Sequence, residues 1–261
     1  MDTFLFGEII FGPVKSRRLG NSLGINLLPN NFKLCNYDCV YCECGWTHKD
    51  EIKTLETKFH PLEGVEKELA KKLVYMHESG MKLDNITFAG NGEPTLHPKF
   101  AEIIDLTIDL RNKYYPEAQI SVLSNATMLH NRKVFDALLK VDKNIQKLDS
   151  AYTETIKIIN RPLKPITAET IIENLKKFNG KVIVQTLFLR GTYNGAIIDN
   201  TTEKEISKWL EAIKYIDPEE VMVYTFARNT PADTLEKVPQ EELNQIAEKV
   251  RKLGINVLVA G

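Results

Sequence analysis

Residues 85–94 read Asn-Ile-Thr-Phe-Ala-Gly-Asn-Gly-Glu-Pro, a short apolar run that ends in a glycine-rich turn. An apolar run without strict polar alternation is typical of a strand covered on both faces, as in a parallel sheet. Gly90 and Gly92 let the backbone turn sharply, Glu93 offers a carboxylate to an ammonium group, and Pro94 stiffens the exit. Taken alone, this stretch also fits an ordinary turn that binds nothing.

The same strand pattern recurs along the chain, with amphipathic helices between the strands. Further strands are expected at residues 24–28, 119–123, 181–189, 221–226 and 255–260. Apolar residues recur at spacings of three and four within residues 65–76, 171–178, 206–213 and 243–250, which predicts helices there. Repeated strand–helix units form parallel sheets with right-handed crossovers, so we predict an α/β fold, doubly wound or a full or partial barrel. Both architectures place function at the carboxyl ends of the strands.

Composition narrows the class of protein. The 261 residues include 34 Lys and Arg against 35 Asp and Glu, a formal net charge of -1. This balance disfavours avid binding to nucleic acid or anionic membranes, although it is compatible with a local basic patch. No run of about 18 apolar residues occurs and residues 1–11 lack a basic start, so we expect a cytoplasmic protein with no membrane span.

All four cysteines lie within ten residues, in the segment Leu-Cys-Asn-Tyr-Asp-Cys-Val-Tyr-Cys-Glu-Cys at 34–44. Disulfides of a secreted protein would be spread along the chain, so this clustering indicates a metal. Cys35, Cys39 and Cys42, spaced C-x3-C-x2-C, can hold three corners of an iron–sulfur cube and leave one iron open to a ligand. A zinc site that also uses Cys44 is the alternative, although zinc ligands usually come as two separated pairs.

In this order and about 50 residues apart, the cysteine loop and the glycine-rich loop resemble those of the radical S-adenosylmethionine (SAM) enzymes. The resemblance implies a [4Fe-4S] cluster on the three cysteines, with the methionyl amine and carboxylate of SAM on the fourth iron. It also implies that the glycine-rich loop binds the methionyl amine and that Tyr41 lies near the adenine. Asn91 stands where the usual loop has Gly, a mild change because Asn tolerates turn conformations.

The resemblance implies further SAM contacts at later strand ends. Ser124 and Asn125 look like the segment that contacts the ribose or carboxylate of SAM in relatives, while Asp149 and Gln185 stand where relatives place other contacts. Helix caps and satisfied core groups explain these four residues equally well. The predicted metal ligands are Cys35, Cys39 and Cys42, and the predicted cofactor-binding residues are Tyr41, Gly90, Asn91, Gly92, Glu93, Ser124, Asn125, Asp149 and Gln185.

The resemblance extends over nearly the whole chain. Residues 11–29, the Ile-Asn-Arg-Pro run at 159–162 and the strand exit at 224–228 resemble a branch of the superfamily related to the catalytic domain of wyosine-base-forming enzymes. This implies a partial (β/α)6 TIM-like barrel in a single domain, residues 1–261. Its expected parts are an N-terminal segment with the cluster loop (1–60), a barrel core (61–226) and a short C-terminal extension (227–261) able to cover the barrel mouth.

The implied activity is reductive cleavage of SAM to methionine and a 5′-deoxyadenosyl radical, which abstracts hydrogen from a substrate. The electron would come from a one-electron reductant of the flavodoxin or ferredoxin type. An incomplete barrel suits a bulky substrate, including a macromolecule. The motifs define this chemistry and leave the substrate open.

Three alternatives remain at this point. A glycyl-radical activating enzyme does the same chemistry on a partner protein, and a non-catalytic zinc module would use the cysteines alone. The third is a tRNA-base-modifying enzyme; wyosine enzymes carry extra cysteines for a second cluster, whereas this chain has only Cys44 to spare. That departure and the charge balance argue against a tRNA substrate.

Other reactive side chains have no clear pattern. Cys44 is read as a bystander, with a resolving thiol or a radical quencher as the alternative. The five histidines show no paired ligand spacing, so we read them as surface or capping residues, with His48 the best spare ligand. Four arginines are candidates for the substrate mouth, although solvated surface positions explain each one equally: Arg17, Arg18, Arg190 and Arg228.

Overall fold

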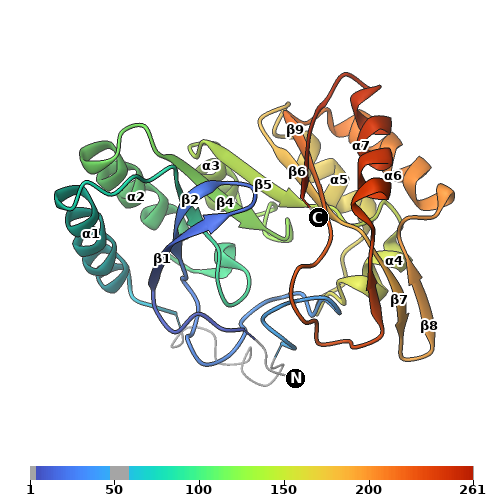
Figure 1. The fold of residues 1–261 in the computed structure, drawn as a ribbon, viewed down its shortest axis with the longest axis horizontal. Helices are drawn as coiled ribbons and strands as arrows, with labels where there is room; N and C mark the ends of the chain where they lie inside the picture. Colours follow the sequence, from blue (N-terminus) through green and yellow to red (C-terminus); the bar gives the residue numbers. More distant parts are fainter. Residues whose placement is uncertain (1–3, 48–58, 261) are drawn as a thin grey trace.

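A single curved sheet forms the centre of the computed structural model, which describes residues 4–47 and 59–260 (Figure 1). Its strand order is β1-β2-β3-β4-β5-β6-β9-β11, in which β1 pairs antiparallel with β2 and every later pair is parallel. The strands of this sheet are β1 (Ile10–Ser16), β2 (Gly20–Ile25), β3 (Asn85–Phe88), β4 (Gln119–Ser124), β5 (Lys143–Lys147), β6 (Ile183–Leu187), β9 (Glu220–Tyr224) and β11 (Asn256–Ala260). The predicted partial barrel is confirmed.

Helices cover the convex face of the sheet, with α1 to α3 over one half and α5 to α7 over the other (Figure 1). They are α1 (Leu62–Glu78), α2 (Phe100–Tyr114), α3 (Arg132–Leu138), α4 (Thr153–Ile159), α5 (Ala168–Lys176), α6 (Glu203–Ile216) and α7 (Gln240–Arg251), with a 3-10 turn η2 at Pro94–Leu96. In the part of the chain that the structure describes, none of them has the length and apolarity needed to cross a membrane.

The helices form where the apolar spacing predicts them. In α1 the predicted face is fully buried against the sheet. Thr167 caps α5 by accepting a hydrogen bond from Thr170 N at 3.1 Å, and Thr202 caps α6 by accepting from Glu205 N at 3.3 Å. The Glu205 carboxylate accepts hydrogen bonds from Ser150 and Thr155, so it ties α6 to the segment after β5.

The run at 181–189 is two strands rather than the single strand predicted. The sheet strand β6 ends at Leu187, and the chain then leaves the barrel as β7 (Leu189–Tyr193). The side chain of Asn200 holds this exit, because it accepts from Leu189 N at 2.9 Å and donates to Leu187 O at 2.8 Å. The prediction of a strand at 24–28 was also displaced. The strand is β2, which ends at Ile25 because the Asn26 side chain is hydrogen-bonded to the Leu28 backbone.

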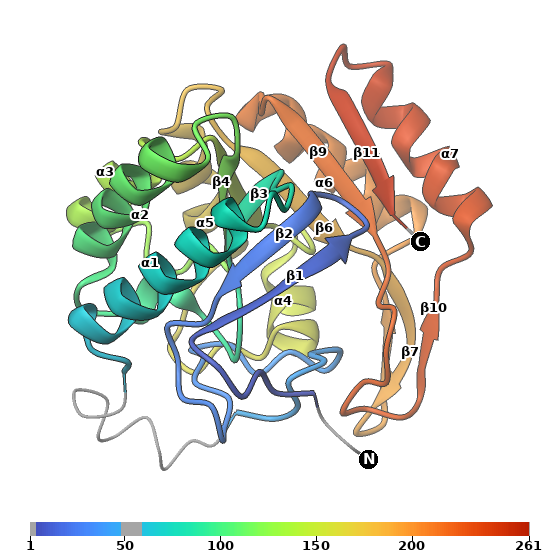
Figure 2. The same ribbon diagram turned by 60° about the vertical axis from the view of Figure 1, so that its left-hand side comes forward.

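Strand β7 belongs to a small separate sheet. It pairs with β8 (Ala196–Asp199) and with β10 (Leu235–Lys237), both antiparallel, beside the cysteine loop (Figure 1). The expected extension after residue 226 contributes β10, α7 and β11. Its last strand, β11, lies beside β9 and adds an edge strand to the main sheet (Figure 2). Ala232 N donates to Val40 O at 3.2 Å and links the extension to the cysteine loop.

The amino-terminal end of the barrel is filled from the turn between β1 and β2. Leu19 in that turn packs inside the barrel against three buried strand residues, Ile145, Ile183 and Met222. A larger apolar core lies between the sheet and the helices and includes the α1 face. Leu19 therefore fills the barrel interior at this end, whereas a cavity lies toward the carboxyl ends of the strands.

The α1 face gives a test of the fold. Leu69 is 0% exposed, so Leu69→Ala should lower the free energy of unfolding by about 2–5 kcal/mol through lost burial and the cavity left behind. Urea denaturation followed by circular dichroism measures this change. The control is Lys67→Ala on the exposed face of the same helix, and an equal loss in both variants would contradict the packing described.

Candidate active site

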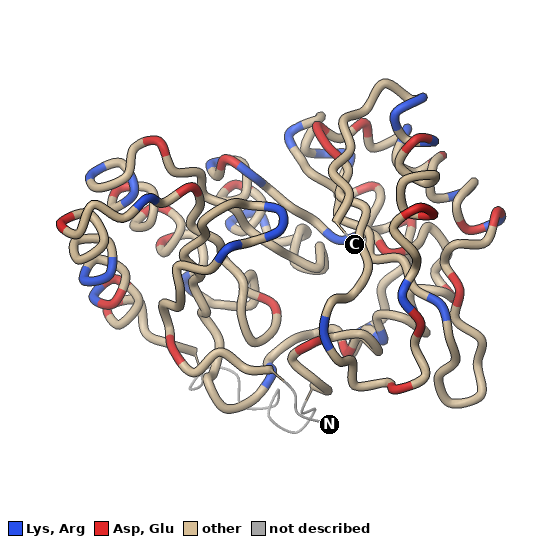
Figure 3. Tube along the Cα trace, in the orientation of Figure 1, with Lys and Arg blue, Asp and Glu red and all other residues tan. Residues whose placement is uncertain are grey.

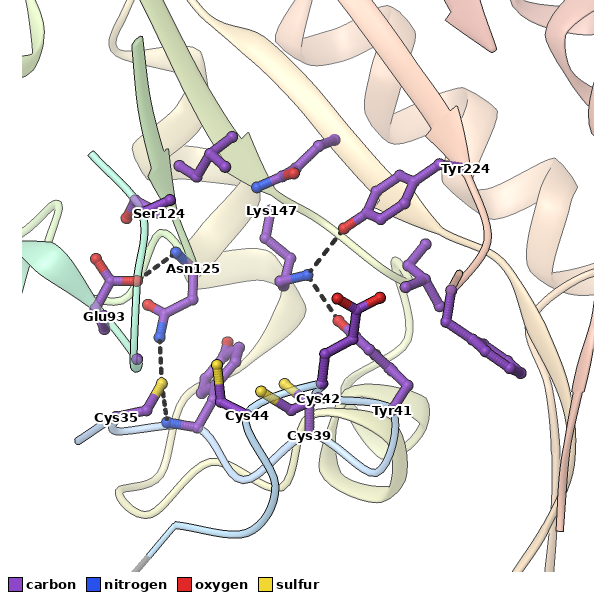
Figure 4. Close-up of a pocket in the computed structure, with 18 of the residues that line it drawn as sticks. Cys35, Cys39, Tyr41, Cys42, Cys44, Glu93, Ser124, Asn125, Lys147 and Tyr224 are labelled. Atoms are coloured by element: carbon purple, nitrogen blue, oxygen red, sulfur yellow. Dashed lines mark hydrogen bonds between the residues drawn. The ribbon is translucent and has the colours of Figure 1, made fainter. Parts of the chain in front are cut away.

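A cavity of about 320 Å³ lies at the carboxyl ends of the strands, between them and the cysteine loop (Figure 4). Most of the predicted site residues line it. Those on the cysteine loop are Cys35, Cys39, Tyr41 and Cys42, and those on the strand exits are Gly90, Gly92, Glu93, Ser124, Asn125 and Gln185. Predicted site residues from four segments, far apart in the sequence, therefore meet at the place where this fold class puts its function.

The cysteine loop and the glycine-rich loop are hydrogen-bonded to each other. Leu34 N donates to Asn91 O at 2.8 Å, and Glu93 N donates to Leu34 O at 3.1 Å, which makes a parallel bridge between Leu34 and Gly92. The bridge lies one residue before the first cysteine. The two motifs recognised separately in the sequence are thus one structural unit, which we call the paired loops.

Glycine is required in the paired loops because the backbones approach so closely. A Cβ atom on Gly92 would lie 1.8 Å from Leu34 O, and one on Gly90 would lie 2.3 Å from Asn26 Oδ1. The first contact is with backbone that cannot move aside without breaking the bridge. Gly92 also has a φ of +141°, a conformation that other residues rarely adopt. The sequence argument from these glycines is therefore correct, although the backbone they approach is the chain's own.

Glu93 presents a buried carboxylate to the cavity. It is 2% exposed, and its two oxygens accept hydrogen bonds from Thr95 N at 3.0 Å and Asn125 N at 2.7 Å. Burial raises the pKa of Glu93 above its ordinary value, and these hydrogen bonds only partly oppose the shift. A cation bound next to this group would recover the electrostatic energy that burial costs.

Amide side chains approach two of the three predicted ligand sulfurs. Asn125 Nδ2 lies 3.6 Å from Cys35 Sγ, and Asn160 Nδ2 lies 3.5 Å from Cys39 Sγ. Tyr37 N also donates to Cys35 Sγ at 3.4 Å. Such N–H groups stabilise a thiolate more than a thiol, as is common around iron–sulfur ligands.

A buried ammonium group faces the cysteines. Lys33 is 2% exposed, and its Nζ donates to Gly45 O at 3.0 Å. Burial alone would lower the pKa of Lys33, but its attraction to Cys42, Cys35 and Cys39 dominates and raises it, so the ammonium stays charged. This charge compensates thiolates on the loop.

The cysteine thiols differ in acidity. Burial raises the pKa of Cys35 to about 12 and raises that of Cys39 as well. A hydrogen bond from the Cys44 thiol lowers the pKa of Cys42 to about 5. Cys44 Sγ also lies 3.5 Å from Gly90 O, and its single proton can serve only one of these two acceptors at a time.

An iron–sulfur cluster fits this donor set. Three thiols from one loop face one cavity, and the buried Lys33 ammonium offsets the negative charge that thiolate ligands carry (Figure 4). Within the described ranges 4–47 and 59–260, no three His, Cys, Asp or Glu side chains converge closely enough to hold a single metal ion. His48 lies outside these ranges, so its predicted role as a spare ligand has no structural description.

Tyr41 is the centre of a polar network on the far wall of the cavity. Its hydroxyl donates to Asp149 Oδ2 in a short hydrogen bond and accepts from Lys147 Nζ at 2.7 Å. Asn160 Nδ2 joins the network at 2.7 Å from the same Asp149 oxygen. The ammonium of Lys147 also lies 3.5 Å from Tyr224 Oη (Figure 4).

Lys147 and Asp149 are a buried ion pair within this network. Their charged atoms are 3.5 Å apart, and the Asp149 side chain is 0% exposed. Burial alone would lower the pKa of Lys147, but the Asp149 carboxylate, together with Tyr224 and Cys39, outweighs this effect and raises the pKa above the ordinary value. A full positive charge therefore lies beside the cavity.

Two predicted site residues do not line the cavity. The Asn91 side chain points away from it and donates to Phe6 O at 2.9 Å and Pro29 O at 2.7 Å, which anchors the N-terminal segment. Asp149 lies behind Tyr41 and accepts from Leu187 N at 3.0 Å. Contacts of these two residues with a cofactor stay predictions.

The turn between β1 and β2 supplies arginine to the cavity. Arg17 and Arg18, two of the four candidates for the substrate mouth, both line it. The Arg18 guanidinium lies 4.7 Å from the centre of the Tyr224 ring, and its Nη1 donates to Gln185 Oε1 at 3.1 Å. These contacts hold Arg18 across the strand ends from the cysteines.

The other two candidate arginines have partners elsewhere. Arg190 is carried out of the barrel by β7 and pairs with Glu242 of α7, so it is a structural link. Arg228 pairs with Glu43 at 2.9 Å and ties the C-terminal extension to the cysteine loop. Arg228 follows β9, as the sequence suggests, whereas Arg190 lies within β7, and neither arginine lines the cavity.

Sequence reasoning missed Lys33, Lys147 and Asn160 as site residues. Lys147 had a signal, because it lies two residues before Asp149, so that both side chains point to the same face of an extended segment and their charges can pair. No sequence signal marked the other two residues. Asn160 contacts Cys39, which is distant in the sequence, and Lys33 donates to a backbone oxygen. His97, read as a surface or capping residue, is buried at 4% exposure and acts at a helix end, since its Nδ1 accepts from Lys99 N at 3.0 Å near the start of α2.

Comparison with known proteins identifies the class. The profile described as the Radical SAM superfamily matches residues 32–213, and the chain belongs to this superfamily. It is therefore a radical SAM enzyme, as its motifs predict.

Its relatives include a UPF0026 protein of Methanocaldococcus jannaschii. That protein is 32% identical over 239 residues, which cover 90% of this chain and 68% of the relative. A protein of Brachyspira hyodysenteriae named GTPase Obg is 28% identical over 247 residues, 93% of this chain. The chain spans only 33% of the length of that second protein.

Solved structures share the fold. A radical SAM methyltransferase from Sphaerobacter thermophilus superposes with a TM-score of 0.66 at 14% identity, over 92% of this chain and 65% of that one. Archaeal TYW1 superposes with a TM-score of 0.53 at 15% identity, over 88% of this chain and 71% of that one. At these identities the likeness concerns architecture alone.

The buried ion pair gives a test of the site. Lys147→Met should lower the free energy of unfolding by about 3 kcal/mol, because it leaves the Asp149 carboxylate buried without its cation. Lys147→Met combined with Asp149→Asn should recover part of that loss, because no net charge remains. Urea denaturation measures both.

The control is Lys140→Met, which removes an exposed pair with Asp105 and should change stability by less than about 1 kcal/mol. The assignment is wrong if Lys147→Met is as mild as this control.

Proposed function

We propose that this enzyme holds a [4Fe-4S] cluster on Cys35, Cys39 and Cys42 and uses it to cleave SAM reductively. The observation that carries the proposal is the pair of loops, which brings three thiols and the Glu93 carboxylate to one cavity. The cluster, when bound, supplies the electron that breaks the S–C5′ bond of SAM, giving methionine and a 5′-deoxyadenosyl radical that removes hydrogen from the substrate.

The chain's own residues prepare the cluster side of the cavity. Lys33 keeps a positive charge next to the thiols, which favours their ionised form and hence ligation. Asn125 and Asn160 direct N–H groups at Cys35 and Cys39. Hydrogen bonds to ligand sulfurs also set the reduction potential of such clusters.

Glu93 is the proposed partner of the methionyl ammonium group. Its oxygens are held by Thr95 and Asn125, so the carboxylate is fixed before the ligand arrives. A charge-assisted hydrogen bond made in a buried cavity is stronger than one made in water. Because the glycine-rich loop is hydrogen-bonded to the cysteine loop, this contact would place SAM at a defined position relative to the cysteines.

The cavity walls also exclude water. Tyr37, Val40 and Leu187 are almost fully buried in an apolar cluster beneath the cysteine loop. A dry site protects a reactive radical from side reactions. We further propose a one-electron reductant of the flavodoxin or ferredoxin type and leave the choice between a small and a macromolecular substrate to experiment.

Cysteine variants test the ligand assignment. Cys35→Ala, Cys39→Ala and Cys42→Ala should each lose the cluster, because two thiolates retain a cube poorly. The control Cys44→Ala should keep it. Iron and sulfide content and the electron paramagnetic resonance signal of the anaerobically reconstituted, reduced protein measure both.

Formation of 5′-deoxyadenosine from SAM with dithionite completes this test. About four irons per chain with SAM cleavage would support the proposal. Zinc in place of iron, or equal metal loss in Cys44→Ala, would favour a four-cysteine site instead.

A Glu93 variant tests SAM binding. Glu93→Gln removes the charge and should weaken SAM binding to the cluster-loaded protein by about 10- to 100-fold without loss of iron. In the wild type, the carboxylate gains a proton as the pH falls through its raised pKa. SAM affinity should therefore fall on acidification at a higher pH than an ordinary glutamate would give.

Calorimetric titration of SAM across pH measures these effects. The control is Glu220→Gln, because burial raises the pKa of Glu220 as well, although it lies at the opposite end of β9. Glu93→Gln should reduce the pH dependence and Glu220→Gln should leave it intact. Undiminished SAM affinity in Glu93→Gln would remove the assigned role of the loop.

A further inference from the structure

A second cavity lies on the outer side of the cysteine loop, away from the strand ends. Its volume is about 870 Å³, and it is lined by Lys157, residues 161–166 and Asp38. We call it the basic groove. The proposed function assigns it no role.

Positive charge predominates in the basic groove. Three cations line it, Lys157, Arg161 and Lys164, against one carboxylate, Asp38, whose side chain is 4% exposed. Lys157 also pairs at 2.7 Å with Glu154, just outside the groove, and both groups are largely exposed. The exposed charge that the groove offers to a partner is therefore net positive. Over the described part of the molecule as a whole, acidic and basic residues are interspersed (Figure 3).

The wall of the groove is the back of the cysteine loop. Asp38 N donates to Asn160 O at 2.9 Å, and Val40 N donates to Ile159 O at 2.9 Å. Tyr37 and Pro162 form an isolated antiparallel β-bridge. Asp38 directly precedes Cys39 in the chain. The groove and the proposed cluster thus lie on opposite faces of a single layer of backbone.

Asn160 connects the two faces. Its backbone belongs to the segment that forms the groove, and its side chain lies 3.5 Å from Cys39 Sγ and 3.2 Å from Tyr41 Oη on the cavity side. An electron that enters at the groove would therefore meet a ligand sulfur after one side chain. Transfer rates fall steeply with distance, so this is a short entry route.

The groove is held rigidly. The Arg161 guanidinium lies over a pair of neighbouring aromatic rings, 5.0 Å from the centre of Trp46 and 4.9 Å from that of Tyr193. It also pairs with Asp38 at 3.3 Å. A surface fixed in this way loses little conformational entropy when a partner docks.

We propose that the basic groove is the docking site of an acidic protein electron carrier. The carrier loses one electron and the cluster gains it by way of Asn160 and Cys39, and no bond is made or broken. Charge complementarity selects the partner, because a net positive groove attracts an acidic protein and speeds their encounter. This inference rests on the proposed cluster.

Charge reversal tests the docking site. Lys157→Glu/Lys164→Glu changes exposed side chains and leaves Arg161 and the cysteine loop intact. The rate of cluster reduction by a recombinant flavodoxin in its hydroquinone form, followed anaerobically from visible absorbance, should fall by about tenfold at low salt. The difference from the wild type should shrink as salt rises.

A small reductant and a matched variant serve as controls. Reduced methyl viologen needs no docking surface and should reduce the clusters of wild type and variant at equal rates. Lys67→Glu/Lys71→Glu makes the same charge change on exposed positions of α1, on the opposite half of the molecule, and should leave the flavodoxin rate near that of the wild type. The single variant Lys164→Glu repeats the test with a smaller perturbation.

The outcomes separate the two proposals. Flavodoxin reduction that is as fast in the groove variant as in the wild type, or equally slowed in the α1 variant, would overturn the docking site. Normal cluster reduction that depends on the groove, but without 5′-deoxyadenosine from SAM, would support the docking site and overturn the proposed function.

Discussion

The bridge between Leu34 and Gly92 is the constraint on which the site depends. Through it, the first cysteine is placed by a strand exit of the barrel and not by its own loop alone. Asn125, at the exit of β4, and Asn160, at the C-terminal end of α4, then hold two of the sulfurs. A long loop that would otherwise be mobile is therefore fixed by contacts with the most rigid part of the fold.

Buried charges are the second element of the design. Lys33 faces the thiols, and Lys147 is paired with Asp149 on the opposite wall. Each ammonium is costly to bury alone and is kept charged by its anionic neighbours. Together with Glu93, they give a small cavity several fixed charges, which suits the recognition of a zwitterionic, sulfonium-bearing ligand better than that of an apolar one.

The sequence predicts the architecture and the two motifs well, because both depend on local patterns. Apolar periodicity located α1, α5, α6 and α7, and the cysteine spacing and glycine-rich turn located two walls of the cavity. The sequence predicted one strand at 181–189 and missed the break after Leu187. That break is held by Asn200, a partner that local pattern does not show. Asn160 was missed for the same reason, because it contacts Cys39 across the fold, whereas Lys33 was missed because its hydrogen-bond acceptor is a backbone oxygen. The direction of the Asn91 side chain depends on an N-terminal segment with no periodic signal.

The turn between β1 and β2 has a consequence for the evolution of this enzyme. Leu19 closes the base of the barrel, and its neighbours Arg17 and Arg18 reach the cavity above it. The turn thus contributes to the depth and the charge of the cavity through three residues that belong to no strand. A change confined to this short hairpin turn would alter the floor of the cavity and leave the sheet and the paired loops unchanged, which is a simple route to new substrates on an old scaffold.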